Sequence, residues 1–428
     1  MMISFIFELI MIIGTLILVQ SSAHPLRKLV SEEIEDKAHL RETICDRLTR
    51  LRQIATKLGS HSHRICNASS SYVLITEYQF GNSGNQYVEL THALWMADQL
   101  NATLVIPKYM TPILKPFNLA ILHSSFCFLQ EHEYIALPTS SSNERVIFEL
   151  ESEDSFFFWK IFDGAPIDRP DRKPNKALPP LSKNIVHNIS KHYLKVFACL
   201  WSSPRAAILD EALHIISKRM NNKLNYTAVH KRSMEGGCSK LLFEETTLDD
   251  FDPQQLPMNR SEWNNNLQQS HPICEFPMNF IKNTIELNLD KKSKKKQQHP
   301  IFIAWDGRGN IDEYLSSIPP AIFSSDIVST SHSTLSDNQG KEWRKFVDMM
   351  VSMHGTLFIL NPRSTFSWAI YIVRVMLDLK SVPVMKSKDI YCTRKSIYEN
   401  RKNETIGYDG LWVSWTSVQE AMNEINNI

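Results

Sequence analysis

The sequence lacks a strong net charge of either sign, and this bounds the partners that it can bind. Lys and Arg total 47 residues and Asp and Glu total 46, so the formal net charge is +1 over 428 residues. Broad nucleic-acid binding needs an excess of cations facing the phosphates. We therefore expect no nucleic-acid partner. The strongly basic run KKSKKKQQH, at residues 291–299, is expected to be a solvated loop before a strand, with a nuclear-localisation or polyanion-binding patch as the alternative.

The seven cysteines form no CxxC pair, which argues against a zinc site and against a thiol redox motif. Cysteines spread along a chain are typical of structural disulfides in an oxidising compartment. Because their number is odd, one of them must stay unpaired or pair outside this chain.

The N-terminus lacks the basic residues that normally precede a signal sequence, although it has the rest of the pattern. An apolar run extends from Leu9 to Val19, and the tripeptide SSA, which suits signal peptidase, follows it. We interpret residues 1–23 as a cleaved signal peptide. An acidic residue before the run and two basic residues after it keep an uncleaved membrane anchor open as the alternative.

Glycosylation sequons support passage through the secretory pathway. They lie at Asn67, Asn101, Asn188, Asn225, Asn259 and Asn403. The last residues lack a KDEL-like tetrapeptide, which is the usual signal for retention in the endoplasmic reticulum (ER). We expect the protein in the lumen of the ER or Golgi, anchored to the membrane if the N-terminal segment is kept, or secreted.

Two changes of composition divide the rest of the chain. Residues 24–70 are charged, with apolar residues at helical spacing, which predicts a helical stem or an N-terminal helix packed on the first domain. Residues 166–183 are rich in proline and charge, which is typical of a linker. They separate a predicted N-terminal lobe over 71–165 from a predicted C-terminal lobe over 184–428.

The most informative segment is FGNSGNQYVELTHALWMADQLNATLVIP, at residues 80–107. A β-rich run precedes it, so the order is strand, glycine-rich turn, helix and strand, which predicts the first βαβ unit of an α/β domain. The turn combines glycines, which allow a ligand close to the backbone, with carboxamides where the helix begins. These residues are Gly81, Asn82, Gly84, Asn85 and Gln86. Such a turn suits a phosphate or a sugar hydroxyl, and a tight connection without a ligand is the alternative.

Three further fragments read as strand ends or strand-to-helix turns. They are VHKRSMEGGC at 229–238, FIAWDG at 302–307 and FVDMMVSMHGTLFILNPRSTFSW at 346–368. With the first segment, and most specifically with its GNQ turn and LNATLVIP, they resemble in order the GDP-fucose protein O-fucosyltransferases. The likeness to the α1,2- and α1,6-fucosyltransferases is looser. The resemblance covers roughly residues 72–383 and implies a GT-B fold, with two Rossmann-like lobes facing each other across a cleft.

The strand predicted to start at Asn225 points His230 and Arg232 to one face, because side chains alternate along a strand. A forked guanidinium can bind two phosphate oxygens there. In the resemblance, Arg232 matches the family's phosphate-binding arginine and is a predicted catalytic residue. His230 is expected to orient that arginine or to contact the sugar, with a hydrogen-bonded structural histidine as the alternative.

Ser364, Thr365 and Phe366 stand where a predicted strand gives way to a helix. Hydroxyls and free amides at a helix N-terminus attract anions, and an ordinary N-cap is the alternative. The resemblance implies that these residues hold the diphosphate, with Phe366 close to the nucleoside. It also places Asp306 near the nucleotide, at the carboxyl end of a predicted strand, where ligands of parallel sheets collect.

The resemblance matches Asn85 to a family asparagine close to the donor linkage and the acceptor oxygen, which makes it the second predicted catalytic residue. A carboxamide can orient the incoming hydroxyl but cannot remove its proton at neutral pH. Glu77 and Glu235 are candidate bases, with a solvated or structural role as the alternative for each. The identity of the base therefore stays open.

Similar enzymes carry cysteines at the places of Cys238 and Cys274, which implies a disulfide between these two residues. It would close a loop of about 35 residues and stabilise the fold by roughly 3 kcal/mol through loop entropy. We expect this loop to hold Arg232 in position.

A DxD carboxylate pair at a strand end, which holds the metal ion of many transferases, is missing. The run with these letters, Asp249 to Asp252, follows no clear apolar strand. Fixed cations and amides would then neutralise the leaving diphosphate. We therefore expect neither a metal ion nor another cofactor, and GDP-fucose as the donor substrate.

The resemblance implies an inverting, metal-independent glycosyltransferase that moves fucose from GDP-fucose to a hydroxyl acceptor. The tripeptide SME after Arg232, where the α1,2-fucosyltransferases have Gly-Asp, favours a protein Ser or Thr as the acceptor. A glycan-directed fucosyltransferase of the α1,2 or α1,6 type is the alternative. A secreted pseudoenzyme that binds a glycan or a protein without catalysis is the third interpretation.

Overall fold

The computed structural model describes sixteen stretches of the chain. They are residues 35–59, 71–74, 83–137, 146–149, 189–220, 222–231, 243, 247–254, 256, 259–264, 271–288, 300–305, 321–323, 337–361, 364–383 and 415–426. The predicted signal peptide and the predicted linker lie outside these residues. Within them, no helix is long and apolar enough to cross a membrane.

The first sheet has four parallel strands in the order β3-β2-β1-β4. The strands are β1 (Ser71–Leu74), β2 (Thr103–Ile106), β3 (Phe128–Gln130) and β4 (Val146–Glu149). Helix α2 (Ser83–Gln99) follows β1 and precedes β2, in the predicted order of strand, turn, helix and strand. All four residues of β2 are buried, which is typical of a parallel strand covered on both faces.

The second sheet has five parallel strands in the order β7-β6-β5-β8-β9. The strands are β5 (Thr227–Lys231), β6 (Ile301–Trp305), β7 (Ala321–Phe323), β8 (Leu357–Leu360) and β9 (Ser381–Pro383). Helix α16 (Asp337–His354) precedes β8, and helix α17 (Thr365–Met376) connects β8 to β9.

In both sheets the strand order reverses beside the first strand. In the second sheet, β5 lies between β6, the next strand in the chain, and β8, the third strand after β5. This is the order of doubly wound α/β folds, in which ligands bind at the carboxyl ends of the two diverging strands. The chain is thus a mixed α/β protein with parallel sheets, and its topology directs attention to the ends of β5 and β8. The two-lobe GT-B arrangement stays a prediction.

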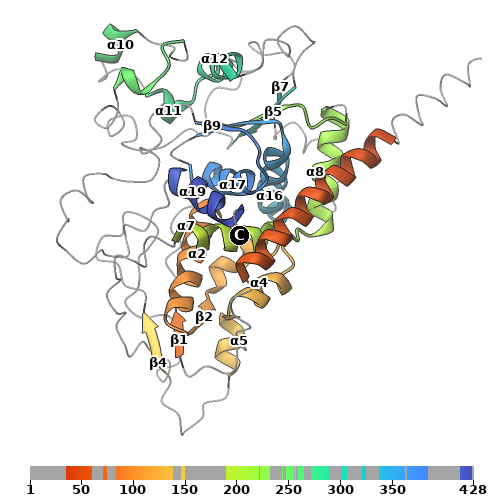
Figure 1. Cartoon of the computed structure of the whole chain (residues 1–428), viewed down its shortest axis with the longest axis vertical. Coiled ribbons are helices and arrows are strands. Elements are labelled where there is room, and N and C mark those ends of the chain that lie inside the picture. The colour runs from red at the N-terminus through yellow and green to blue at the C-terminus, as the bar shows by residue number, and fades with distance from the viewer. Residues whose placement is uncertain are drawn as a thin grey trace, which may run out of the picture.

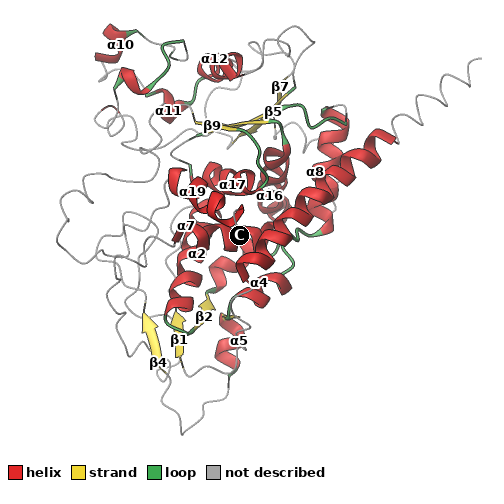
Figure 2. Ribbon diagram, viewed as in Figure 1, coloured by secondary structure: helices red, strands yellow, loops and turns green. Residues whose placement is uncertain are grey.

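Helices lie between the two sheets (Figures 1 and 2). Helix α17 packs against α2 and α7 (Ile189–Trp201), and α16 packs against α8 (Ala206–Arg219). Helix α19 (Trp415–Asn426) packs against α7 and α17. One cluster of buried apolar side chains continues through this layer from α2 to α17. The sequence of α17, TFSWAIYIVRVM, is apolar on nearly every face because other elements enclose the helix.

Shorter elements complete the described fold. They are η1 (Lys108–Met110), α3 (Thr111–Leu114), α4 (Ala120–Ser125), α5 (Glu131–Ala136), η3 (Leu248–Asp250), α10 (Arg260–Asn264), α11 (Pro272–Glu275) and α12 (Met278–Asn288).

The helix over residues 35–59 packs on the protein along its length. Its apolar face, which includes Ile44 and Leu51, joins the main core. Arg47 Nη1 donates a hydrogen bond of 2.7 Å to the carbonyl of His354, the last residue of α16. The described part of this helix thus packs on the protein, and its contacts reach α8 and the end of α16, which belong to the predicted C-terminal lobe and not to the first domain. The domain boundaries stay predictions.

Arg374 is a charged side chain enclosed within the helix layer, with a relative exposure of 0%. Its guanidinium donates hydrogen bonds to backbone carbonyls at the end of α16 and in the connections to β8 and β9. The acceptors are Ser352, Met353, Gly355, Thr356 and Lys380. Burial lowers the pKa of Arg374 to about 9. This one side chain therefore serves carbonyls that the helix and the turns leave without partners.

Candidate functional site

The carboxyl ends of β5 and β8 bring together two of the predicted segments. The penultimate residue of β5 is His230, and β8 ends at Leu360, four residues before Ser364. The side chain of His230 is buried, and its Nδ1 lies 2.8 Å from the Oγ of Ser367 in the first turn of α17. Its ring lies 4.5 Å from the ring of Phe366, measured between centroids. The structure thus places His230 beside the STF turn, and its hydrogen bond with Ser367 is one that a structural histidine makes. A contact of His230 with Arg232 or with a sugar stays a prediction.

Ser364 occupies the N-cap position of α17, but its hydroxyl does not act as a cap. The backbone is extended there, with φ −101° and ψ 119°, and the side chain accepts no hydrogen bond from the helix. The residue is 2% exposed, and its Oγ forms no hydrogen bond with any described residue. A buried polar group without a partner is destabilising by about 1–3 kcal/mol. The predicted alternative of an ordinary N-cap is therefore wrong for Ser364, and its hydroxyl can serve a ligand.

The N-terminus of α2 meets the N-terminus of α17 at Gly84. A Cβ added to Gly84 would lie 2.6 Å from the backbone nitrogen of Phe366 and 2.6 Å from the Oγ1 of Thr365. Side-chain atoms cannot fit there, so the close approach requires glycine. Each helix N-terminus carries about half a positive charge and amides without helical acceptors. The two positive ends reinforce each other, which makes the junction suited to an anion such as a diphosphate.

Hydrogen bonds tie the end of β8 to the start of α17 and to α11. The Asn361 amide donates to the Oγ of Ser367 at 3.1 Å, and the Ser364 amide donates to the Asn361 carbonyl at 3.1 Å. The Asn361 side chain donates through Nδ2 to the carbonyl of Ile273 in α11, also at 3.1 Å. Asn361 is fully buried. The polar ends of β8 and α17 are thus fixed to α11 before any ligand binds.

Cys274, beside Ile273, is disulfide-bonded. Its predicted partner, Cys238, lies outside the described residues, so the pairing stays a prediction. Cys127 is also disulfide-bonded, whereas Cys45 and Cys199 are free. The bridge at Cys274 stabilises the segment to which Asn361 is tied, so it supports the candidate site indirectly.

The predicted site residues divide into those that the structure places and those that it does not describe. Gly84, Gln86, His230, Ser364, Thr365 and Phe366 are described and lie at the N-termini of α2 and α17 or at the end of β5. The backbone of Asn85 is described within the first turn of α2. The residues outside the described part are Glu77, Gly81, Asn82, Arg232, Glu235, Cys238 and Asp306.

The DxD-like run does not stand at a strand end. Asp249 and Asp250 belong to η3, a single turn of 3₁₀-helix, and the side chain of Phe251 is fully buried. Among the described residues, no group of three or more His, Cys, Asp and Glu side chains is placed to hold a metal ion. Independence from metal stays a prediction.

Glu89 is a buried acid that the sequence analysis did not single out. It lies on α2, one helical turn after Asn85, and is 3% exposed. Tyr109 donates a hydrogen bond of 2.5 Å from its hydroxyl to Glu89 Oε1. Burial raises the pKa of Glu89 from 4.5 to about 8, while the bond from Tyr109 opposes the rise. The available signal was an acid flanked by valine and leucine in the helix predicted after the glycine-rich turn.

Replacing Glu89 with glutamine is expected to change how stability depends on pH. Between about pH 4.5 and 8 the folded state keeps a proton that the unfolded state releases, so the free energy of unfolding falls as pH rises, by up to about 1.4 kcal/mol per pH unit. Glu89→Gln cannot ionise and still accepts from Tyr109. Urea unfolding should therefore show the variant more stable than the wild type at pH 8 and similar to it near pH 4.5. The exposed Glu286→Gln serves as the control, and curves that run parallel for both variants would refute the assignment.

The sequence matches no protein-family model, and no curated protein is significantly similar to it. Among solved structures, it is similar to crystal structures of POFUT1. The apo form is 17% identical with a TM-score of 0.43, and the alignment covers 73% of this chain and 97% of that chain. The complex with GDP is 18% identical with a TM-score of 0.43, covering 74% and 98%. The complex with GDP-fucose is 17% identical with a TM-score of 0.42, covering 73% and 97%. Likeness at these values establishes no shared activity.

Proposed function

We propose that this protein is an inverting, metal-independent fucosyltransferase that uses GDP-fucose and transfers fucose to a protein Ser or Thr hydroxyl. The observation that carries the proposal is the junction of the N-termini of α2 and α17, with the unpaired Ser364 hydroxyl buried beside it. A nucleoside diphosphate is the anion that fits such a junction at the carboxyl ends of β5 and β8.

Five of the predicted residues have distinct tasks in this proposal. The amides of α17 and the Ser364 hydroxyl hold the diphosphate, and Phe366 lies near the nucleoside. Arg232, two residues after His230, neutralises the charge that grows on the leaving GDP. Asn85 aligns the acceptor hydroxyl for attack on the face of the fucose opposite the diphosphate, which inverts the configuration. Asp306 contacts the nucleotide.

A calorimetric titration with GDP, GDP-fucose and GDP-mannose tests the donor site. We expect the wild type to bind GDP-fucose. Ser364→Ala should weaken GDP binding about tenfold or more, because a hydrogen bond to a charged group contributes about 1.5–3 kcal/mol. The exposed Ser261→Ala on α10 is the matched control and should bind like the wild type. Absence of GDP binding by a folded wild-type protein would overturn the proposal.

Transfer of labelled fucose to protein and glycan acceptors then tests the reaction. We expect transfer to a folded protein acceptor that persists in EDTA and is lost in Arg232→Ala. Transfer only to glycans would replace the protein acceptor by a glycan one. Binding of GDP-fucose without turnover on either acceptor would favour the non-catalytic interpretation. Residence in the lumen of the ER or Golgi, with or without an N-terminal anchor, is part of the same proposal.

A further inference from the structure

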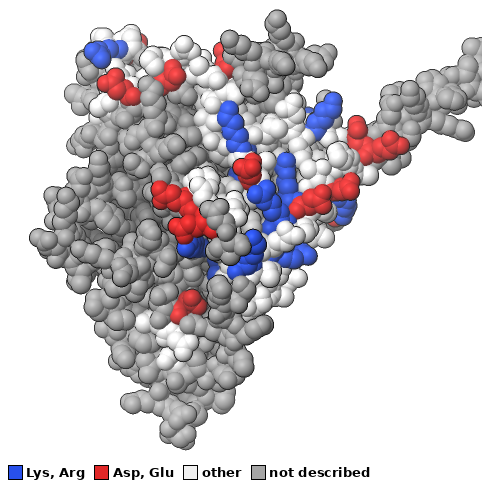
Figure 3. Space-filling view, viewed as in Figure 1, with Lys and Arg blue, Asp and Glu red and all other residues white. Residues whose placement is uncertain are grey.

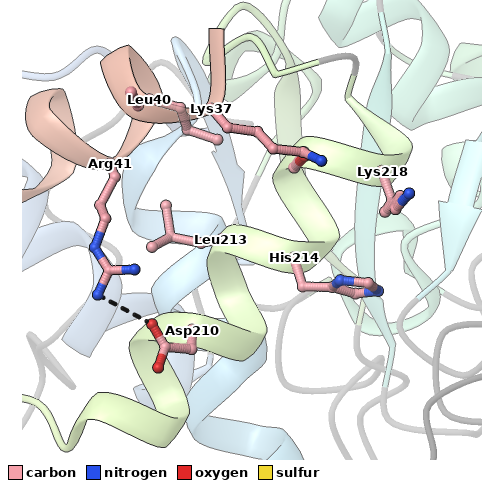
Figure 4. Close-up of a pocket in the computed structure, with 9 residues that line it drawn as sticks. Lys37, Leu40, Arg41, Asp210, Leu213, His214 and Lys218 are labelled. Carbon is pink, nitrogen blue, oxygen red and sulfur yellow. Dashed lines mark ion pairs between the residues drawn. The ribbon is translucent and has the colours of Figure 1, made fainter. Parts of the chain in front are cut away.

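A cavity lies between the helix over residues 35–59 and α8, away from the candidate site. It has a volume of about 390 Å³ and shares no lining residue with the donor junction. Figure 4 shows the side chains that line it, with Lys37 and Arg41 on one helix and Asp210, His214 and Lys218 on the other. A cavity of this size falls in the range of small-molecule sites, about 300–1,000 Å³.

Among the charged side chains that line this cavity, the basic ones outnumber the acid. Asp210, the acid in the lining, pairs with Arg41 at 3.3 Å (Figure 4), so its charge is already balanced. Lys218 and His214 form no ion pair within the part of the chain that the structure describes. Lys37 adds a further ammonium group on the opposite side. In Figure 3, blue and red side chains lie together on the face where the two helices cross. The balance of charge favours an anionic ligand.

Spacing along the two helices places the basic groups next to each other. Lys37 and Arg41 are four residues apart on one helix, and His214 and Lys218 are four residues apart on the other. Residues at this spacing are neighbours on a helix surface. An anion bound between the helices would therefore lie between Lys37 on one helix and Lys218 on the other.

Other lining atoms suit the uncharged part of such a ligand. The Ser217 Oγ is buried and forms no hydrogen bond with any described residue, so it can donate to an oxyanion. Leu40 and Leu213 are nearly fully buried and give the cavity an apolar floor. The cavity is also much larger than the roughly 30 Å³ share of one water molecule. A bare ion would leave most of this space unfilled.

We propose that this cavity binds a sugar that carries a phosphate or sulfate ester, with the ester held by Lys37, Ser217 and Lys218 and the sugar ring resting on the leucine floor. The site is separate from the proposed donor site and does not depend on the proposed reaction. Phosphate and sulfate share the tetrahedral oxyanion that this lining recognises.

Titrations with glucose 6-phosphate, N-acetylglucosamine 6-sulfate and neutral glucose, on the full-length protein with saturating GDP present, test the proposal. We expect either ester to bind with a dissociation constant of about 1 mM or lower, and glucose to bind at least tenfold more weakly. The stronger of the two esters identifies the natural one. GDP occupies the donor site, so phosphate binding that GDP abolishes would place the ligand there and overturn the proposal.

Variants locate the ligand. Lys218→Gln is expected to weaken ester binding about tenfold and to reduce its salt dependence. The exposed Lys223→Gln, just beyond α8, is the matched control and should bind like the wild type. Because Lys218 is exposed, its replacement should leave thermal stability unchanged. Unchanged ester affinity in Lys218→Gln, or equal affinity for glucose and its phosphate, would refute the proposal even if GDP binding fails as well.

Discussion

Arg374→Met is expected to lower the free energy of unfolding by about 3–5 kcal/mol, the usual loss when one partner of a buried charged network is removed. The methionine fills similar volume but donates no hydrogen bond. The carbonyls of Ser352, Met353 and Gly355 would then be buried without the donor that serves them in the wild type. Of the substitutions considered for this protein, this one should affect stability most.

Urea unfolding monitored by tryptophan fluorescence measures the effect. Arg374→Lys retains the charge but cannot reach acceptors on both α16 and the β9 connection, so an intermediate loss is expected. The exposed Arg260→Met on α10 is the control, with a change within about 0.5 kcal/mol. If Arg374→Met is too unstable to purify, the yield of soluble protein ranks the variants instead. Arg374→Met should then yield less soluble protein than Arg374→Lys. A change below about 1 kcal/mol in Arg374→Met would contradict the structural role.

Gly84→Ala is expected to separate α2 from α17 and to weaken GDP binding at least tenfold. The new Cβ would meet the backbone of Thr365 and Phe366 at 2.6–2.9 Å, and backbone atoms cannot rotate aside as a side chain can. Overpacking of this kind costs about 1–3 kcal/mol. Moving the two helix ends apart also weakens the shared positive potential, so affinity and stability should fall together.

The sign of the stability change distinguishes this contact from helix propensity alone. Alanine favours a helix interior over glycine by about 1 kcal/mol, so a glycine without a tertiary role would be stabilised by the change. Thermal unfolding and GDP titration of Gly84→Ala, beside Gly59→Ala, make the comparison. A Cβ at Gly59 would meet the Ser125 hydroxyl at 3.0 Å, and this side-chain atom can move where backbone atoms cannot. A Gly84→Ala protein that is more stable than the wild type and binds GDP normally would show that the close approach is unimportant.

Local sequence patterns determined much of the fold because each of them acts within a few residues. The glycine-rich turn after a β-rich run predicted the first βαβ unit, and the structure contains β1, α2 and β2 in that order. The strand that ends near His230 and the helix that begins after Ser364 were predicted in the same way. Alternation and helical periodicity are properties of adjacent residues, so they can be read without knowing what packs against them.

The sequence by itself determined the α/β class and the order of the first βαβ unit, while the roles of the candidate residues at the ends of strands and helices stay predictions. Only the tertiary structure decided that Gly84 touches Phe366, that the Ser364 hydroxyl is buried without a partner, and that Arg374 and Glu89 lie in the interior. Gly84 and Phe366 are far apart in the chain, and Ser364, Arg374 and Glu89 owe their hydrogen bonding or pKa to burial. Which side chains are buried, and which distant segments meet, depends on how the helices and sheets pack together. The raised pKa of Glu89 and the unpaired hydroxyl of Ser364 are consequences of that packing.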